Sequence, residues 1–241
     1  MHMDYHAFTR ELVDSLSANG SILGIVALGS MAERNGRTPD RFSDHDFFVI
    51  TEEAEPLRSS TEWLPEPQTI VLWFRETAHG CKAIYEDGHL IEYAVFTPDE
   101  LQLARVNDYR VLLDRERIEE RMAGLAALPS PSVDREYLRG MFLSHILVAA
   151  TRAQRGELLS ARFMLTHAMR FLVQLVGGGP DNLDPLRRFS HFNKGEEIER
   201  AMQQEITAAA RALLMIYVAR FGDDTATATV RRTLETPFAS R

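Results

Sequence analysis

Strand-like and helix-like segments separate almost completely along this chain. Up to residue 126, short apolar runs typical of strands alternate with stretches of helical spacing. Beyond the segment 127–132 (Ala-Leu-Pro-Ser-Pro-Ser), which has the composition of a linker, only helical spacing is found. This separation predicts an α+β first half and a helical bundle as the second half. We therefore expect two domains, residues 1–128 and 133–241, each long enough to bury a core.

The first half is expected to form a mixed β-sheet with flanking helices. Apolar runs bounded by turn residues predict strands at 22–28, 46–50, 70–74, 82–85, 90–96 and 109–113. Asp87-Gly88 is a strong hairpin signal between two of these runs. Helical spacing or start signals predict helices at 5–16, from Thr97 onward, and at 115–125, with a short turn of helix at 30–34. In the second half, helices are expected at 135–155, 157–176, 196–221 and 225–234.

Charge is unevenly distributed between the two halves. Residues 1–128 carry 12 Lys and Arg against 23 Asp and Glu, a net charge of −11, whereas residues 129–241 carry a net charge of +3. An acidic half is unsuited to non-specific binding of nucleic acid, which relies on neutralising phosphates, so no nucleic-acid partner is expected. It suits a cationic ligand or divalent metal ions, although solubility alone also explains it.

The composition also bears on the cellular compartment in which the protein is expected. Cys81 is the single cysteine, which excludes an internal disulfide framework and a cysteine-based zinc site. Arg211 and Arg220 interrupt the longest apolar stretch, so no membrane span is expected. The N-terminal residues include acids and lack the apolar core of a secretory signal. We expect a cytoplasmic protein.

The sharpest candidate site is Gly29-Ser30 at the end of an apolar run, followed after thirteen intervening residues by Asp44-His45-Asp46 at the start of another. Residues i and i+2 of a strand project from one face, so Asp44 and Asp46 point together with their Cα atoms about 6.5–7 Å apart. Two carboxylates this close need a cation, and Mg²⁺ takes carboxylates together with phosphate oxygens. Two such ions can clamp both oxygens of an in-line phosphoryl displacement. Gly29 would let the backbone approach a phosphate, and Ser30 would donate to it from its hydroxyl and from its N–H at a helix start.

These residues resemble the signature of the polymerase-β-like nucleotidyltransferases. The resemblance rests on segment 25–30 (Ile-Val-Ala-Leu-Gly-Ser) and segment 42–49 (Phe-Ser-Asp-His-Asp-Phe-Phe-Val). The helical second half, with Arg-Gly-Glu at 155–157 between two long helices, further resembles the lincosamide and aminoglycoside nucleotidyltransferases. Two departures are visible: His45 stands where an apolar residue is usual, and Arg34 and Gly36 come later than the family's Ala-Arg-Gly.

The resemblance implies transfer of a nucleoside monophosphate from an NTP to a hydroxyl group of a small acceptor, with release of pyrophosphate. Asp44 and Asp46 would hold two Mg²⁺ ions. A third acid, as ligand or as base toward the acceptor, is expected on a later strand, and Glu92 is the candidate because it lies in the apolar run 90–96. Glu86 and Asp87 are the competitors, but both stand at the Asp-Gly turn.

A triphosphate also needs cations. In the implied architecture the helical domain closes over the NTP, and Arg187, Arg188 and Lys194 are the candidate phosphate contacts. Solvated charges at helix ends are the alternative interpretation of these three residues.

Three alternatives remain open at this level. One is a toxin–antitoxin-like transferase acting on a protein or RNA, with a partner chain and an exposed apolar patch on the helical half. A related one is a ribonuclease of the HEPN type, since Arg162 and His167 fit its Arg-x4–6-His spacing. The third is a nucleotide-binding module without turnover. A homodimer is also left open.

Overall fold

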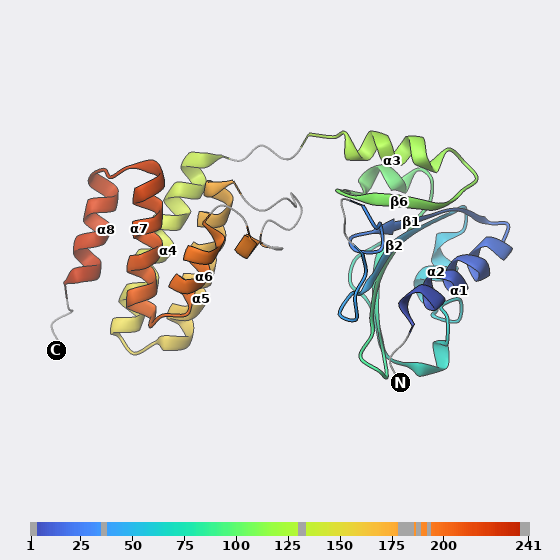
Figure 1. The fold of residues 1–241 in the computed structure, drawn as a ribbon, viewed down its shortest axis with the longest axis horizontal. Helices are drawn as coiled ribbons and strands as arrows, with labels where there is room; N and C mark the ends of the chain where they lie inside the picture. Colours follow the sequence, from blue (N-terminus) through green and yellow to red (C-terminus); the bar gives the residue numbers. More distant parts are fainter. Residues whose placement is uncertain are drawn as a thin grey trace. The chain divides into compact units, whose positions relative to one another are not determined.

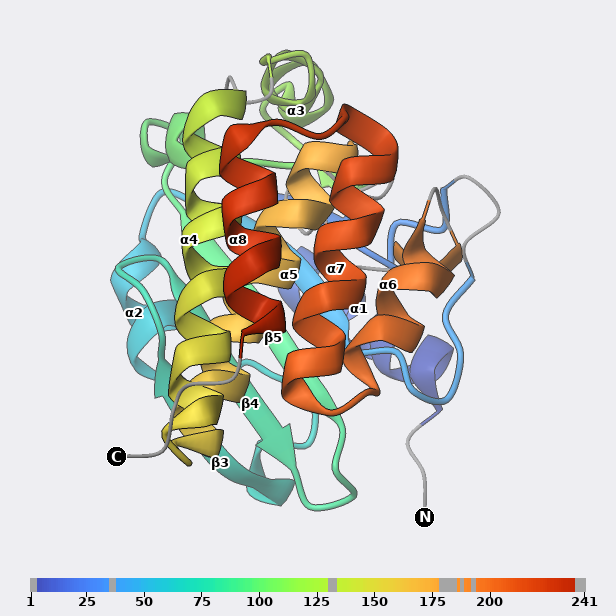
Figure 2. The same cartoon turned by 90° about the vertical axis from the view of Figure 1, so that its left-hand side faces the viewer.

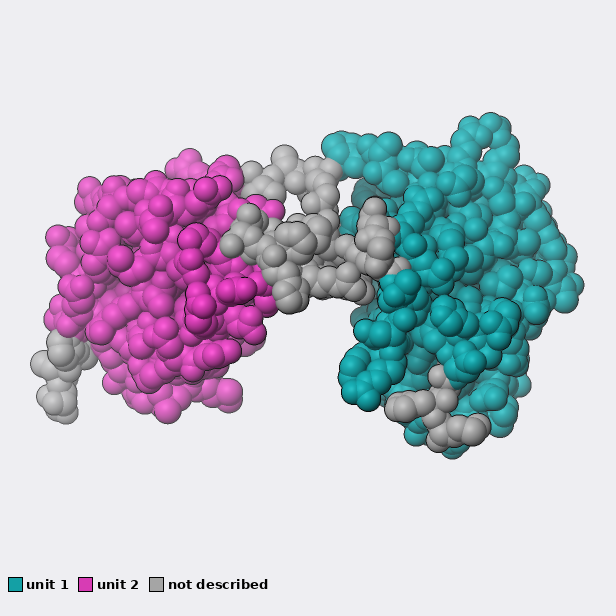
Figure 3. Space-filling view, viewed as in Figure 1, with its two compact units in different colours: residues 1–129 teal, residues 130–241 magenta. Residues whose placement is uncertain are grey.

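The computed structural model describes residues 4–34, 38–129, 134–177, 186, 189–191 and 194–236. The chain divides into two compact units, Met1–Pro129 and Ser130–Arg241 (Figures 1 and 3). Each unit has its own apolar core. The predicted α+β first half and helical second half are confirmed.

The first unit is built on a six-stranded mixed sheet. Its strands are β1 (Ile22–Leu28), β2 (His45–Thr51), β3 (Ile70–Arg75), β4 (Gly80–Tyr85), β5 (Leu90–Phe96) and β6 (Tyr109–Asp114). They lie in the order β3-β4-β5-β2-β1-β6. The β2–β5 pairing is parallel and the other pairings described are antiparallel. All six predicted strands are present, with ends shifted by at most two residues.

Helices cover both faces of this sheet (Figure 1). On one face, α1 (Tyr5–Ala18) and α2 (Ala54–Ser59) pack through residues such as Phe8 and Leu12 against inward-facing side chains of the central strands. On the other face, α3 (Ile118–Ala126) and the 3₁₀ helix η2 (Glu100–Leu103) form a second, smaller core. Because strand side chains alternate, Phe47 enters the α1 core, whereas Phe48 packs at the α3 core.

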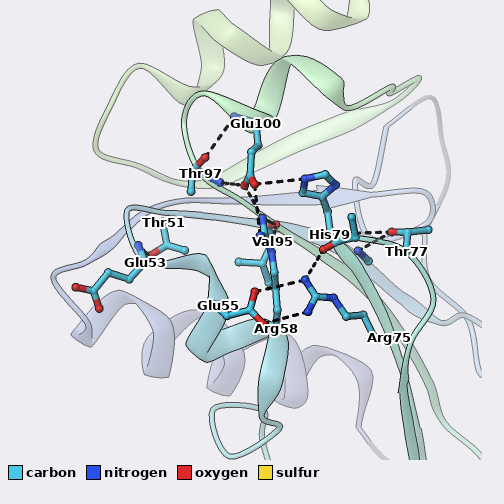
Figure 4. Close-up of polar contacts among 12 residues, drawn as sticks. Thr51, Glu53, Glu55, Arg58, Arg75, Thr77, His79, Val95, Thr97 and Glu100 are labelled. Carbon is cyan, nitrogen blue, oxygen red and sulfur yellow. Dashed lines mark hydrogen bonds and ion pairs between the residues drawn. The ribbon is translucent and has the colours of Figure 1, made fainter.

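A buried arginine anchors α2 and η2 to the end of β5 (Figure 4). Arg58 is 8% exposed; its Nε and Nη2 atoms donate to the Val95 carbonyl at 3.0 and 2.7 Å. The same guanidinium pairs with Glu100, and His79 Nε2 lies 3.5 Å from the other carboxylate oxygen. The hydrogen bond from Arg58, helped by the Thr97 backbone N–H, lowers the pKa of Glu100 to about 2.

The second unit is a helical bundle. It contains α4 (Arg135–Gln154), α5 (Leu158–Val176), α6 (Gly195–Met202), α7 (Ile206–Phe221) and α8 (Thr225–Glu235), with a short 3₁₀ turn at Phe189–His191. The first unit has a similar 3₁₀ turn at Pro67–Thr69. In Figure 2, α4, α7 and α8 run alongside one another. Their core is dominated by leucine, alanine and valine side chains such as Leu172 and Leu213. No helix within the described ranges is both long and apolar enough to span a bilayer.

Several element predictions were wrong in detail. The helix expected at 30–34 is a pair of hydrogen-bonded turns, with Ala32 N donating to Leu28 O. Thr97 and Glu100 do cap each other, at 2.9 and 3.3 Å, but the element they start is the single turn η2. A capping pair sets where a helix starts and not how long it runs.

The helix expected at 196–221 is two helices. The first, α6, ends at Met202, and Glu205 begins α7, because its carboxylate accepts hydrogen bonds from the backbone N–H groups of Thr207 and Ala208. Glutamate is not among the preferred N-cap residues, which is why the break carries little signal in the sequence. The short helix α2 was also not predicted.

Candidate active site

Asp46 and Glu92 are direct neighbours on adjacent strands. In the parallel β2–β5 pairing, Asp46 is the Cα partner of Glu92, just as Phe48 is the partner of Ala94. Paired residues of neighbouring strands share a face and stand about 4.8 Å apart at Cα. Both side chains therefore lie on the sheet face opposite α1, and both residues are half-buried. The structure thus brings together two of the three predicted acids.

Asp44 immediately precedes β2 and is held by the first residue of α1. The Tyr5 hydroxyl donates to the Asp44 carbonyl oxygen at 3.1 Å. Burial raises the pKa of Tyr5, the nearby Ser30 hydroxyl opposes that shift, and the negative charges of Asp44, Glu33 and Asp46 add to it. The Tyr5 hydroxyl therefore lies within electrostatic range of both aspartates and beside Ser30.

The turn after β1 has the backbone and the hydroxyl expected of a ligand-binding turn. Gly29 adopts a φ of 51°, a left-handed conformation that favours glycine. Ser30 is 6% exposed; its Oγ atom lies near the Tyr5 hydroxyl, and among the described residues it makes no well-formed hydrogen bond. A buried hydroxyl that lacks a good hydrogen bond is unfavourable, and a bound ligand could supply the acceptor. Because no helix starts at Ser30, the prediction that it donates from a helix start was wrong, and the hydroxyl remains as the donor.

Glu92 lies on an interior strand and is paired with a lysine. β5 runs between β4 and β2, so an edge position does not explain this acid. Lys82 is the Cα partner of Glu92 on β4, and its Nζ atom is 3.1 Å from Glu92 Oε1 and 3.1 Å from Glu76 Oε1. The hydrogen bond that Lys82 donates to Glu92 raises the pKa of Lys82. Lys82, Glu92 and Asp46 thus form one row across three strands.

The competing acids have other positions. Asp87 Oδ1 accepts a hydrogen bond from the backbone N–H of His89 at 3.0 Å, which is the turn chemistry expected of an Asp-Gly hairpin. Glu86 is exposed at the same turn. Glu92 therefore remains the better candidate for the third acid.

The predicted phosphate contacts of the second half are not assembled into a site here. Arg187 and Arg188 lie outside the described residues. Lys194 is exposed and its Nζ atom pairs with Glu197 at 2.6 Å, one turn along the same helix. Its assignment as a phosphate contact stays a prediction.

The arginine of the ribonuclease-like spacing is used in the bundle itself. The Arg162 guanidinium donates to the carbonyl oxygens of Met202 and Gln204 at 3.2 Å each, where α6 ends. His167 instead packs edge-on against Phe163. These contacts give Arg162 a structural role and weaken the ribonuclease interpretation.

The donor set fits magnesium, although the carboxylates are not gathered as a preformed metal site. Within the described ranges, no three His, Cys, Asp or Glu side chains are placed to hold a metal ion together. Asp44, Asp46 and Glu92 offer hard carboxylate oxygens from adjoining positions, and such oxygens are the ligands that Mg²⁺ takes along with phosphate. Asp44, Asp46 and Glu92 are therefore the residues that could hold it.

Four contributors to this region were not predicted from the sequence: Tyr5, Thr9, Lys82 and His89. Tyr5, Thr9 and His89 act through contacts between segments distant in the chain, whereas Lys82 meets Glu92 across the β4–β5 hairpin. The visible signal was His45, a polar residue at an inward-facing position of an otherwise apolar strand.

Comparisons with known proteins give loose likenesses. An aminoglycoside 6-adenyltransferase from Bacillus subtilis aligns over 96% of this chain and 92% of its own, at 10% identity and a TM-score of 0.31. A nucleotidyltransferase-like protein from Exiguobacterium sibiricum 255-15 aligns over 95% of this chain and 74% of its own, at 16% identity and a TM-score of 0.36. No protein-family model and no curated protein matches the chain. Likenesses this loose do not assign an activity, which has to be argued from the residues.

Proposed function

We propose that this protein is a magnesium-dependent nucleotidyltransferase that moves a nucleoside monophosphate from an NTP to a hydroxyl group of a small molecule. The observation that carries the proposal is the pairing of Asp46 with Glu92 across the parallel β2–β5 strands, with Asp44 two residues before Asp46. The resemblance of segments 25–30 and 42–49 to the nucleotidyltransferase signature agrees with it.

In the proposed reaction, the acceptor oxygen forms a bond to the α-phosphorus of the NTP. The bond from that phosphorus to the bridging oxygen breaks, and pyrophosphate leaves with the electron pair. The hydroxyl proton passes to Glu92 or to solvent. Bound Mg²⁺ ions would supply electrostatic stabilisation of the attacking and leaving oxygens.

The chain's own residues divide the remaining work. Gly29 allows close approach of the turn backbone to phosphate, and the buried Ser30 hydroxyl donates to it. Asp44 and Asp46 supply the carboxylates for the ions, and Glu92 serves as the third ligand or as the base. Arg187, Arg188 and Lys194 are proposed as further phosphate contacts.

An aminoglycoside or a lincosamide is the proposed class of acceptor. The net charge of −11 on residues 1–128 favours a polycationic acceptor such as an aminoglycoside, through an attraction that salt would screen.

Pyrophosphate release tests the proposal. Each of the four NTPs is incubated with Mg²⁺ and the protein, alone and with each member of an aminoglycoside and lincosamide panel. We expect release that requires both an acceptor and Mg²⁺. Nucleotide binding without release under any combination would instead support a binding-only module or a macromolecular acceptor.

A further inference from the structure

Beneath the candidate acids lies a polar cluster that the proposed reaction does not use. His45, between the two aspartates, is 0% exposed and faces α1, opposite to Asp46. Its ring stacks on the Tyr5 ring at a centroid distance of 3.8 Å and also contacts Phe8. A fully buried imidazole in this aromatic setting needs hydrogen bonds for both of its nitrogens.

Both nitrogens have partners. His45 Nε2 lies 2.9 Å from Thr9 Oγ1 of α1, and His45 Nδ1 lies 2.7 Å from His89 Nε2, just before β5. Burial, with the neighbouring His89 adding to it, lowers the pKa of His45 to about 3, and burial also lowers the pKa of His89. Burial thus favours the neutral form of each ring, which carries one N–H.

Counting protons assigns the donor and the acceptor of each hydrogen bond in the cluster. Thr9 Oγ1 uses its single proton toward the Tyr5 carbonyl oxygen at 2.9 Å, so it accepts from His45. His45 is then protonated on Nε2, its Nδ1 atom accepts, and His89 must donate from its own Nε2. The result is one chain of donors from His89 through His45 and Thr9 to the backbone of α1.

The position of this chain of hydrogen bonds matters for the candidate site. His45 is the Cα partner of Ile91, and His89 lies two residues before Ile91, so the two rings join β2 and β5 where their parallel pairing begins. The next pair along is Asp46 with Glu92. A slip of one residue in this register would send one of these acids to the opposite face.

We infer that His45 and His89 are positioning residues, whose ring-to-ring hydrogen bond holds the start of the β2–β5 pairing and keeps Asp46 opposite Glu92. The inference rests on the proposed function for its consequence in turnover, but its structural part does not need turnover. His89 touches neither metal nor substrate in this role and acts through Asp46 and Glu92.

Three variants test the inference in the full chain. His89→Ala removes the hydrogen bond, His89→Gln restores an N–H donor near the position of Nε2, and Phe8→Leu removes ring contacts with both histidines but no hydrogen bond. Mn²⁺ titration, kcat at saturating NTP and amide hydrogen exchange at residues 45–48 and 90–94 are measured for each.

We expect His89→Ala to weaken Mn²⁺ binding, to speed exchange at both segments and to lower kcat roughly 10- to 100-fold, the scale of a misplaced reacting group. His89→Gln should recover most of each loss, and Phe8→Leu should leave Mn²⁺ affinity and kcat unchanged. If His89→Ala behaves like Phe8→Leu, or His89→Gln is no better than His89→Ala, the inference is overturned.

Two readouts separate this inference from the proposed function. A wild-type protein that never releases pyrophosphate contradicts the proposed function, while exchange and Mn²⁺ binding still decide the positioning role. Nitrogen-15 NMR of the imidazoles supplies the other readout: both rings should be protonated on Nε2 and unprotonated on Nδ1. Protonation of either ring on Nδ1 would contradict the chain of donors.

Discussion

Asp46 and Glu92 face each other across a parallel strand pairing, although β3 and β4 separate them in sequence. Lys82 continues the same row on β4, with its ammonium 3.1 Å from Glu92. The candidate site is thus a row of two acids and one lysine across three neighbouring strands, next to the Gly29-Ser30 turn that ends β1. Each of these features leads to a measurable expectation.

Ser30→Ala should separate a ligand-binding hydroxyl from a structural one. The Ser30 Oγ atom is buried and makes no well-formed hydrogen bond to any described residue, so removing it should leave the free energy of unfolding unchanged or slightly raised. Affinity for NTP should fall about tenfold, the value of a hydrogen bond to a charged group. Chemical denaturation measures the free energy of unfolding, and nucleotide titration measures the NTP affinity. A clear loss of stability with unchanged NTP affinity would contradict the assignment.

Gly29→Ala should weaken both the fold and nucleotide binding. A Cβ atom at a φ of 51° costs about 1 kcal/mol, and it also stands where the backbone is proposed to approach phosphate. Gly29→Asn should recover stability, because asparagine tolerates this conformation, but should not recover NTP affinity. Gly156→Ala, at another positive-φ glycine, is the matched control. Gly156→Ala should lower the free energy of unfolding by a similar amount and leave NTP affinity unchanged, as measured by thermal unfolding and nucleotide titration.

Lys82→Met should tighten metal binding. The Lys82 ammonium neutralises Glu92 and Glu76, and its removal leaves their charge to attract a cation. For a charge this close but partly exposed, we expect Mn²⁺ to bind about 3- to 10-fold more tightly at low ionic strength, with the gain shrinking as salt is added. Lys194→Met is the control, since the chain has no other lysine and Lys194 also pairs with one glutamate. Weaker Mn²⁺ binding in Lys82→Met would mean that Glu92 is not a metal ligand.

Glu100→Gln should destabilise the first unit in a pH-dependent way. Arg58 lowers the pKa of Glu100 from about 4.5 to about 2, so the pair stabilises the fold fully above pH 4.5 and loses this contribution as the pH falls from 4.5 to 2. Near pH 7 the variant should lose about 2 kcal/mol, less than a fully buried pair, since 31% of the Glu100 side chain is exposed.

Urea unfolding at several pH values tests this pair. The difference between wild type and Glu100→Gln should narrow steadily below pH 4.5. Glu55→Gln, which removes a mostly exposed partner of Arg75, should change stability little at any pH. A difference that stays constant from pH 7 to pH 2 would show that the Arg58–Glu100 charge pair is not its source.

Local signals were enough to predict much of this fold. The apolar runs marked all six strands, and Asp87-Gly88 marked the β4–β5 hairpin, because turn chemistry and side-chain alternation act over a few residues. The break at Glu205 escaped prediction because an unusual cap divides a continuous helical pattern.

The acids of the candidate site stand out one by one in the sequence, but their arrangement does not. Asp44, Asp46 and Glu92 stood out as acids beside apolar runs, yet nothing local states that β2 pairs with β5, or in which register. That register depends on contacts between distant segments, such as His45 with His89 and with Thr9 of α1. The lysine opposite Glu92 is a different case, because it stands on the other arm of the β4–β5 hairpin, and its pairing follows from the register of that hairpin.

The position of a radioactive label tests the central claim most directly. Parallel reactions with Mg²⁺ and the acceptor panel use ATP labelled at the α-phosphorus or at the γ-phosphorus, with wild type, Asp46→Asn and the exposed-acid control Glu86→Gln. The account predicts that the α-label enters the acceptor, that the γ-label leaves as pyrophosphate, and that Asp46→Asn lowers transfer at least about 100-fold while Glu86→Gln does not. Transfer of the γ-label to the acceptor, or undiminished transfer by Asp46→Asn, would contradict it.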